Sequence, residues 1–418
     1  MRHLITFLIL VFTNTSQSQE LLTLEKCYRL VKTNYPLSKQ SELLAKQNSL
    51  DLEVIKTGNL PQLDFAIQAT YQSDVTHLPI ALPNSNIEIP NKDQYKATLS
   101  VNQLIFANGL IKTTEEVKKA SLKTKQKQVE VNLYQVKKQI NQLYFSILFQ
   151  QEKRVLLTSK KELLRTKLKE VTAGIKFGAV LPTSDNVLEA EILKIEQQLI
   201  ETESNKNSLL ASMSSLLGFP VTTKTIFENP TTLNSDSNEI NRPEIDLFKL
   251  KKEEIESSEQ LISKQNVPKL VSFATGGYGN PGLNMLDNSF QPFYLIGLKL
   301  NWTILDWNTN KKQRESLLIN KEIIDNEQEV FELNTTIELN QQSAEIAKIS
   351  EYIQSDTKII DLHKTILKSS ESQLKNGVIT ASSYITDLTN LTEAESNLST
   401  HKIQLQLAQA NYNTTNGN

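Results

Sequence analysis

The chain has 418 residues, a formal net charge of −2 and one cysteine. Because 45 Lys and Arg residues balance 47 Asp and Glu residues, the sequence lacks the basic excess of nucleic-acid-binding proteins, and we expect no nucleic-acid partner. One cysteine excludes an intramolecular disulfide and a multi-cysteine zinc site, and the four histidines are scattered, so we expect no metal site. With 12 Gly, 12 Pro and 6% aromatic residues, the composition favours long solvated helices over one large core.

The N-terminus has the pattern of a secretory signal. Two basic side chains precede an apolar run from Leu4 to Phe12, and small serines follow, with cleavage expected after Ser18. We therefore interpret residues 1–18 as a signal peptide. Cys27 lies well beyond this run and is expected to be a small buried apolar residue on a helix. No later stretch of 18 apolar residues follows, so we expect no membrane-spanning helix.

The sequence repeats itself once. Matching residues recur at a constant offset, and the offset changes only in the Pro- and Asn-rich loop at residues 76–92. Examples are Asn59, Pro61, Lys176 and Gly178, which recur as Asn266, Pro268, Lys375 and Gly377. We predict two structural repeats, residues 19–218 and 241–418, joined by a linker at 219–240 in which Val221 to Phe227 form a short strand.

Each repeat has the same predicted layout of a helix, two strands and a long helical hairpin. The helices are expected at 22–57 and 243–264, the strands at about 62–73, 95–106, 269–279 and 292–305, and the hairpins at 107–218 and 306–417. In the first strand Leu63, Phe65 and Ile67 alternate with more polar residues, which is typical of a strand with one apolar and one polar face.

The hairpins have a coiled-coil pattern. From residue 110 to 177 there is no proline, and apolar residues recur in steps of three and four over roughly 100 Å of helix. Gly178 and Gly377 suit the left-handed residue that follows a helix end. A second helix starts a few residues later, with Pro182 near its first turn in the first repeat and Thr380 as its cap in the second. Short loops of this kind predict antiparallel hairpins.

Four amphipathic strands cannot close a barrel by themselves, so several chains must contribute to one barrel. An apolar face and a Gln-, Thr-, Asn- and Lys-rich face suit lipid outside and water inside. Aromatic residues near the strand ends predict a membrane-interface girdle, with an ordinary sandwich core as the alternative. The girdle candidates are Tyr71, Tyr95, Tyr278, Phe293, Tyr294 and Trp302.

In order and spacing, these segments resemble the TolC-like outer membrane efflux channels. The segments are LTLEKCYRLVKTNYPL, GNLPQLDFAIQATYQ, VNQLIFANGL, KFGAVLPTSDNVLEAE, NRPEI and KNGVITASSYITDL, which together span nearly the whole mature chain. The resemblance implies an α+β fold of mostly long α-helical coiled coils: a helical α-barrel plus a transmembrane β-barrel with four strands per protomer.

The resemblance also implies a function. A homotrimer would sit in the lipid of the outer membrane of a Gram-negative cell, with its helical tunnel in the periplasm. It would be a passive exit duct of a tripartite efflux pump or type I secretion system, energised by an inner-membrane pump through a periplasmic adaptor protein. Drugs, toxic ions and polypeptides all remain open as cargo.

By the same resemblance, the hairpin tips contact the adaptor. The matching positions are Gly178, Ala179, Val180, Leu181, Pro182, Thr183, Gly377, Val378, Ile379 and Thr380. Among them we expect Val180, Leu181, Val378 and Ile379 to be exposed contacts. The two glycines also serve to turn the chain.

The family often narrows its tunnel with acidic rings just past the tips, and this sequence departs from that pattern. The matching positions carry Ser184, Ser383 and Thr386, so a cation-selective aperture is not expected. The neighbouring Asp185 and Asp387 either line the tunnel or favour the helix dipole at a helix start.

Two other patterns are decoys. Gly277, Gly279 and Gly282 spell GxGxxG, but no helix opens there, and we expect an external turn between the last two strands. No Ser, His and Asp or Cys and His set has supporting context, so we expect no enzyme, no catalytic residue and no cofactor. The alternative to a channel is an exported periplasmic coiled-coil scaffold or adhesin, which leaves the paired amphipathic strands unexplained.

Overall fold

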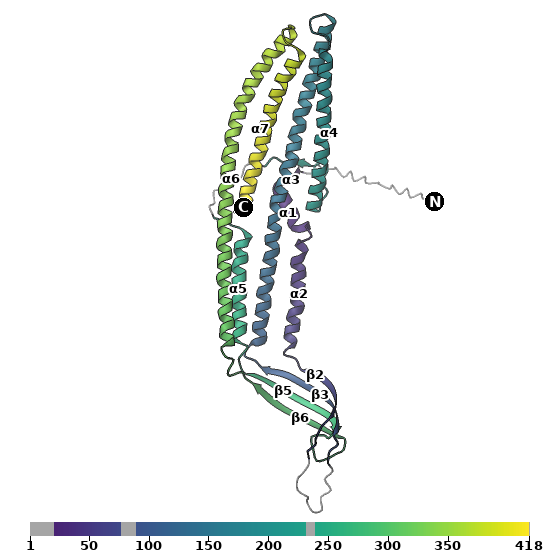
Figure 1. The fold of residues 1–418 in the computed structure, drawn as a ribbon, viewed down its shortest axis with the longest axis vertical. Helices are drawn as coiled ribbons and strands as arrows, with labels where there is room; N and C mark the ends of the chain where they lie inside the picture. The colour runs from purple at the N-terminus through teal and green to yellow at the C-terminus, as the bar shows by residue number, and fades with distance from the viewer. Residues whose placement is uncertain (1–20, 77–88, 231–238, 418) are drawn as a thin grey trace, which may run out of the picture. The chain divides into compact units, whose positions relative to one another are not determined.

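The computed structural model describes residues 21–76, 89–230 and 239–417, which form two compact units (Figure 1). The first unit comprises Met1–Lys39, Glu130–Pro243 and Phe331–Asn418, and the second comprises Gln40–Val129 and Glu244–Val330. Each unit therefore draws on both halves of the sequence. The predicted signal peptide, most of the predicted 76–92 loop and residues 231–238 of the linker lie outside the described residues.

The order of elements is similar in the two halves of the chain. The first half contains β1 (Leu21–Leu22), α1 (Leu24–Asn34), α2 (Ser38–Thr57), β2 (Gln62–Tyr71), β3 (Asp93–Phe106), α3 (Leu110–Lys176) and α4 (Ser184–Leu217). The rest contains β4 (Ile226–Phe227), α5 (Pro243–Ser263), β5 (Lys269–Asn280), β6 (Gln291–Asn301), α6 (Thr309–Lys375) and α7 (Ala381–Asn416). The predicted strands and hairpins are all present, with small differences at their ends.

The single helix predicted at 22–57 is wrong, because the chain breaks between α1 and α2. Pro36 disfavours helical backbone in the residue before it, and Tyr35 is extended with φ −61° and ψ 135°. At the other end of α1, the Thr23 hydroxyl accepts a hydrogen bond from the backbone N–H of Lys26 (3.1 Å), a regular N-cap. α1 is thus a separate short helix.

In the first unit, α1 packs into a core with α3 and α4. Cys27, Tyr144 and Met213 are fully buried there. The Tyr144 hydroxyl hydrogen-bonds with the carbonyl oxygens of Leu22 (2.9 Å) and Glu228 (2.6 Å). Leu22 belongs to β1 and Glu228 directly follows β4, so Tyr144 holds the parallel pair β1–β4. Of the strand predicted at 221–227, only the last two residues form a strand.

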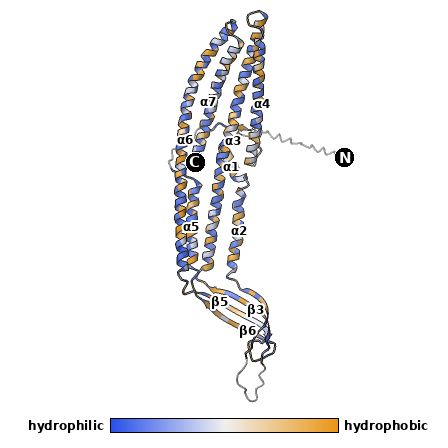
Figure 2. Cartoon of the chain, viewed as in Figure 1, coloured by the Kyte–Doolittle hydropathy of each residue, from blue (hydrophilic) through white to orange (hydrophobic). Residues whose placement is uncertain are grey.

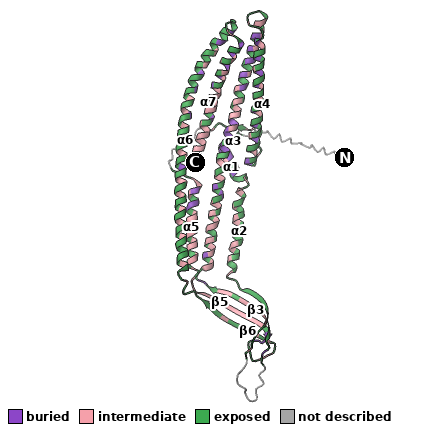
Figure 3. Cartoon of the chain, viewed as in Figure 1, coloured by how far each residue is buried: buried purple, intermediate pink, exposed green. Residues whose placement is uncertain are grey.

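A second core in the same unit lies near the hairpin tips. Its buried side chains come from all four hairpin helices, and Figure 3 shows buried residues along α3 and α4. They are Leu157, Leu164, Val171, Leu188, Ile192, Ile195, Leu374, Ala381, Tyr384 and Leu388. The three- and four-residue spacing read from the sequence is therefore the spacing of core contacts.

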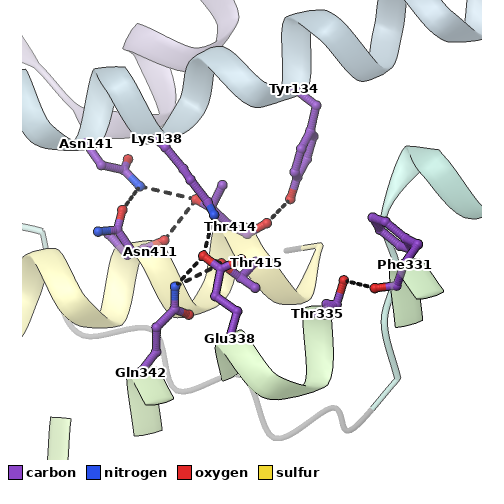
Figure 4. Close-up of polar contacts among 11 residues, drawn as sticks. Tyr134, Lys138, Asn141, Phe331, Thr335, Glu338, Gln342, Asn411, Thr414 and Thr415 are labelled. Atoms are coloured by element: carbon purple, nitrogen blue, oxygen red, sulfur yellow. Dashed lines mark hydrogen bonds and ion pairs between the residues drawn. The ribbon is translucent and has the colours of Figure 1, made fainter. Parts of the chain in front are cut away.

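A buried polar cluster joins α1, α3, α6 and α7 within the first unit (Figure 4). The fully buried Asn141 amide donates to Asn411 Oδ1 (3.0 Å) and Thr414 Oγ1 (3.2 Å), and its oxygen accepts from the Tyr28 hydroxyl. Beside it, Glu338 pairs with Lys138 and accepts from the Gln342 amide (3.1 Å). Figure 4 shows the contacts of Asn141 with Asn411 and Thr414, and those of Glu338, near the end of α7.

The second unit contains an antiparallel sheet and solvated helices. The strand order is β2-β3-β5-β6. Four ion pairs link α5 to the first part of α6: Arg314 with Glu259, Lys321 with Glu256, Lys252 with Asp325 and Lys251 with Glu327. Because each pair is at least partly exposed, each contributes little to stability, and together they indicate a charged, solvated helix surface.

Among the described residues, every helix falls short of the length and hydropathy that crossing a membrane would require.

Candidate functional site

The strand register divides the sheet into two different faces. Leu63, Phe65 and Ile67 of β2 stand opposite Val101, Leu99 and Ala97 of β3. The face they share, called the apolar face below, consists of Leu63, Phe65, Ile67, Leu99, Val101, Tyr294, Ile296, Leu298 and Leu300. Ile67 is 75% exposed and Ile296 is 72% exposed, and Figure 2 shows hydrophobic residues along these strands. An exposed apolar surface of this kind is typical of a membrane or protein contact.

The opposite face, called the polar face below, carries hydrophilic residues on β2 and β3. These are Gln62, Asp64, Gln68 and Thr70 on β2 and Gln94, Lys96, Thr98, Ser100 and Asn102 on β3. The Ser100 and Thr275 hydroxyls hydrogen-bond across β3 and β5 at 3.1 Å. The alternation predicted for β2 is therefore confirmed.

Aromatic side chains gather where β2, β3 and β5 meet the loops. Tyr71 ends β2 and is 78% exposed. The ring of Phe290 stacks against Tyr278 and Tyr95, with centroids 5.6 and 6.5 Å apart. At the other end of the sheet, Trp302 directly follows β6 and is exposed.

Phe293 does not share a face with the other girdle candidates. Tyr294 is 77% exposed on the apolar face, whereas Phe293 belongs to the polar face, because successive strand residues point to opposite sides. Phe293 therefore lies on the opposite face of the sheet from Tyr294, and its place in the girdle stays a prediction.

The turn expected at GGYGNPG also needs correction. Gly277 and Gly279 lie inside β5, which continues to Asn280, and only Gly282 lies beyond the strand. Both strand glycines are required by close neighbours. A Cβ on Gly279 would lie 2.7 Å from the Tyr95 carbonyl oxygen, and one on Gly277 would lie 2.9 Å from the Ala97 carbonyl oxygen.

At the hairpin tips, the expected left-handed glycines are present. Gly178 has φ +70° and Gly377 has φ +69°. Thr380 caps α7 through a hydrogen bond from the backbone N–H of Ser383 (3.2 Å), as predicted. Pro182 is not in the first turn of α4, because that helix begins at Ser184 after a left-handed Thr183 with φ +72°.

The four apolar tip residues are not equally exposed. Leu181 is 60% exposed and Val378 is 71% exposed, whereas Val180 and Ile379 are half-buried against the tip core, contrary to the expectation. Val180 packs so closely on α3 that a Cβ on Gly174 would lie 2.7 Å from its Cγ2. The remaining tip positions, Ala179, Pro182 and Thr183 with both glycines and Thr380, are exposed.

Sequence reasoning missed Phe177, which is 87% exposed at the end of α3. The signal was available, since an aromatic residue directly before the tip glycine has no room in a helix–helix core. Its counterpart in the second predicted repeat is Asn376.

A groove of about 660 Å³ opens beside the tips between the ends of α3 and α6. Lys167, Glu170 and Glu371 line it, and the Lys167 ammonium lies 2.6 Å from both carboxylates. Burial alone lowers the pKa of Lys167, but its hydrogen bonds to Glu170 and Glu371 outweigh burial, and the pKa is raised. The two carboxylates therefore favour the protonated, charged form of Lys167.

The aperture candidates occupy different environments. Ser184 is 6% exposed, whereas Ser383 and Thr386 are exposed. Asp185 lies in the first turn of α4, where a carboxylate favours the helix dipole. Asp387 lies beyond the first turn of α7 and accepts a hydrogen bond from Ser370, so the dipole role does not apply to it.

Comparison with known proteins gives similarity at the level of structure only. No protein-family model matches the sequence, and no curated protein matches it.

Several solved structures have the same fold. The CmeC outer membrane channel of Campylobacter jejuni aligns with a TM-score of 0.64 and 16% identity over 94% of this chain and 85% of that chain. The outer membrane protein VceC of Vibrio cholerae aligns with a TM-score of 0.66 and 12% identity over 94% and 96%. The open-state MtrE outer membrane channel of Neisseria gonorrhoeae aligns with a TM-score of 0.66 and 13% identity over 94% and 88%. The chain therefore has the fold of the TolC-like outer membrane channels, as the sequence resemblance implied.

Proposed function

We propose that this protein is an outer membrane channel, a passive exit duct whose helical tunnel lies in the periplasm. The apolar face of the sheet carries the proposal. It is broad and exposed, it lies opposite a face rich in Gln, Thr and Asn, and it occurs in a chain whose fold is that of solved outer membrane channels. Lipid would cover the apolar face, and water would cover the polar face.

The proposed channel is a homotrimer. Within the described residues, the edge strands β2 and β6 each have a neighbour on one side only. Backbone groups on such an edge have no water to bond within a bilayer, so the edges need partners there. Pairing β2 of one copy with β6 of the next would satisfy both edges and close a barrel around three copies.

Dye release from liposomes tests the channel. Purified protein reconstituted into liposomes loaded with carboxyfluorescein should release the dye while retaining a large fluorescent dextran. Liposomes that retain both the dye and the dextran would favour the exported scaffold. Release of both would indicate damaged membranes and calls for the comparison with protein-free liposomes.

We further propose that the tips dock on a periplasmic adaptor that couples the duct to an inner-membrane pump of a tripartite efflux or type I secretion system. Leu181 and Val378 support this, because they are exposed apolar side chains at the ends of two hairpins. A photo-activated cross-linker placed at either position should capture one periplasmic protein in living cells. The same group at Leu193, 60% exposed but on the body of α4, is the matched control. Equal capture at all three positions would contradict tip docking.

A further inference from the structure

The polar face is not polar along its whole width. Its β5 and β6 strands carry Val271, Phe273, Phe293 and Leu295 in consecutive rows of the register. In the same rows, β2 and β3 carry mostly polar residues, and the two exceptions are Leu104 of β3, opposite Val271, and Ala66 of β2. These four side chains are called the apolar stripe below. They lie in one unit of the structure and on one sheet, on the side opposite the apolar face.

The two phenylalanine rings of the stripe lie over glycines of the neighbouring strand. Phe273 on β5 stands opposite Gly297 on β6, and Phe293 on β6 stands opposite Gly277 on β5. A Cβ on Gly297 would lie 2.8 Å from Phe273 Cζ, and one on Gly277 would lie 2.9 Å from Phe293 Cε1. Each ring therefore lies over a glycine of the neighbouring strand.

Lysines bound the stripe at both ends. Lys299 stands opposite Val271, in the row next to Phe273. Lys96 stands opposite Gly279, in the row next to Phe293, and its Cγ would lie 2.9 Å from a Cβ on that glycine. The two lysine rows are roughly 26 Å apart, from a strand rise of about 3.3 Å per residue.

The charge of this face is positive. Lys269 also belongs to it, and Asp64 supplies the one carboxylate among the described strand residues on this side. Within the same described strands, none of the three lysines has a carboxylate within ion-pair distance, so their charge is available to a passing molecule.

We propose that the apolar stripe and its flanking lysines contact cargo, and that the cargo is an organic anion with an aromatic or apolar body. The proposal rests on the proposed function, which turns the polar face toward the water-filled interior. An aromatic body gains by packing on the Phe273 and Phe293 rings, and an anionic group gains near Lys96 or Lys299. A hydrated metal cation would gain nothing from the rings and would be repelled by the lysines.

Block of single-channel current in a planar bilayer tests this. The probes are 2-naphthalenesulfonate and methanesulfonate, which share an anionic group and differ in the aromatic body. For the wild-type protein, the half-blocking concentration should be about tenfold lower for the naphthalene compound, as expected from aromatic packing worth about 1.4 kcal/mol. Equal half-blocking concentrations would overturn the proposal.

Variants locate the contact. Replacing Phe273→Ser and Phe293→Ser together should bring the two half-blocking concentrations to within about threefold. Phe65→Ser, the same change on the apolar face, should leave the tenfold difference in place. If both variants behave alike, the stripe is not the contact.

A charge variant remains informative if the phenylalanine variant fails to assemble. Lys96→Gln with Lys299→Gln should raise the half-blocking concentration of 2-naphthalenesulfonate and lower that of 1-naphthylmethylammonium. An unchanged ratio between these two probes would overturn the role of the lysines. If wild-type protein conducts no current, the proposed channel function itself fails. Conduction without selective block overturns only the cargo proposal.

Discussion

The Asn141 side chain shows how a single buried amide joins three helices. It is fully buried, and its partners are Tyr28 on α1 and Asn411 and Thr414 on α7. An apolar replacement would remove the amide's hydrogen bonds to all three partners, although the Thr414 hydroxyl would keep its bond to the Ala410 carbonyl oxygen (2.9 Å). Each buried polar group left unsatisfied costs about 1–3 kcal/mol.

Asn141→Leu is therefore expected to lower the stability of the protein by about 2–4 kcal/mol. The readout is the thermal unfolding midpoint, followed by circular dichroism in detergent. Asn340, the counterpart in the second predicted repeat, is exposed, and Asn340→Leu should change stability by less than about 0.5 kcal/mol. Similar effects of the two substitutions would contradict a special role for the Asn141 cluster.

Cys27 should be inert in the folded protein. It is the one cysteine of the sequence and is fully buried on α1, and burial raises the pKa of its thiol to about 12. Ellman's reagent at pH 8 should label no thiol in the native protein and one thiol in denaturant. Rapid labelling of native protein would show that α1 opens readily.

The same thiol makes a pH-dependent contribution to stability. The folded state holds the proton more tightly than the unfolded chain, whose thiol has its ordinary pKa of 9.0. The contribution is therefore fully present below pH 9 and is lost as the pH rises from 9 toward 12. Between pH 8.5 and 10.5, the wild type should lose more stability than Cys27→Ala. Parallel pH profiles would show that the thiol plays no part.

At the scale of elements, the two helix starts at the tips should respond oppositely to substitution. Thr380 caps α7 with its hydroxyl, so Thr380→Ala should destabilise the protein by about 1 kcal/mol. Thr183 makes no such bond and has φ +72°, a strained conformation for a β-branched residue, so Thr183→Gly should stabilise it by about 1 kcal/mol. Unfolding midpoints of the two variants should move in opposite directions; movement in the same direction would contradict this account of the caps.

The ion pairs of Lys167 with Glu170 and Glu371, beside the groove, should also respond unequally to substitution: the loss of stability should depend on which side of the pairs is removed. Lys167 is buried, whereas Glu170 and Glu371 are about half exposed. Removing both carboxylates leaves the buried Lys167 ammonium without a counter-charge, which is costly. Removing the lysine leaves two carboxylates that water can solvate. Glu170→Gln with Glu371→Gln should therefore destabilise the protein more than Lys167→Met, as measured by urea unfolding. The reverse order would show that the lysine charge is solvated in the native protein.

Elements with a clear period were predictable from the sequence, and local exceptions were not. The helices α3 and α6 and the strand β2 follow patterns repeated over many residues, so their type was correct and their ends were close to those predicted. The break at Pro36 was missed because the helical pattern resumes at once on the other side. The face on which Phe293 lies was not predicted, because it depends on the register with β5, which the residues of one strand do not encode.

At the hairpin tips too, the turns could be predicted from the sequence but the burial of side chains could not. Gly178 and Gly377 predicted the turns, because few residues other than glycine adopt positive φ. The burial of Val180 and Ile379 depends on how the end of each hairpin packs on its own core, and spacing alone does not reveal that.

At the scale of the whole molecule, the proposed channel requires copies of the chain to share one barrel. In the part of the chain that the structure describes, the larger sheet has four strands and two edges, and its apolar face has an exposed surface that water would not favour. A membrane and two further copies would cover both features. Cargo would meet the apolar stripe only inside such a barrel, because only a shared barrel would enclose the polar face.

The most direct test is the native mass of the protein extracted with detergent from separated outer membranes. We predict a stable complex of three chains in that fraction. A monomer or dimer recovered from the soluble periplasm would leave the sheet edges unpaired and would contradict the channel.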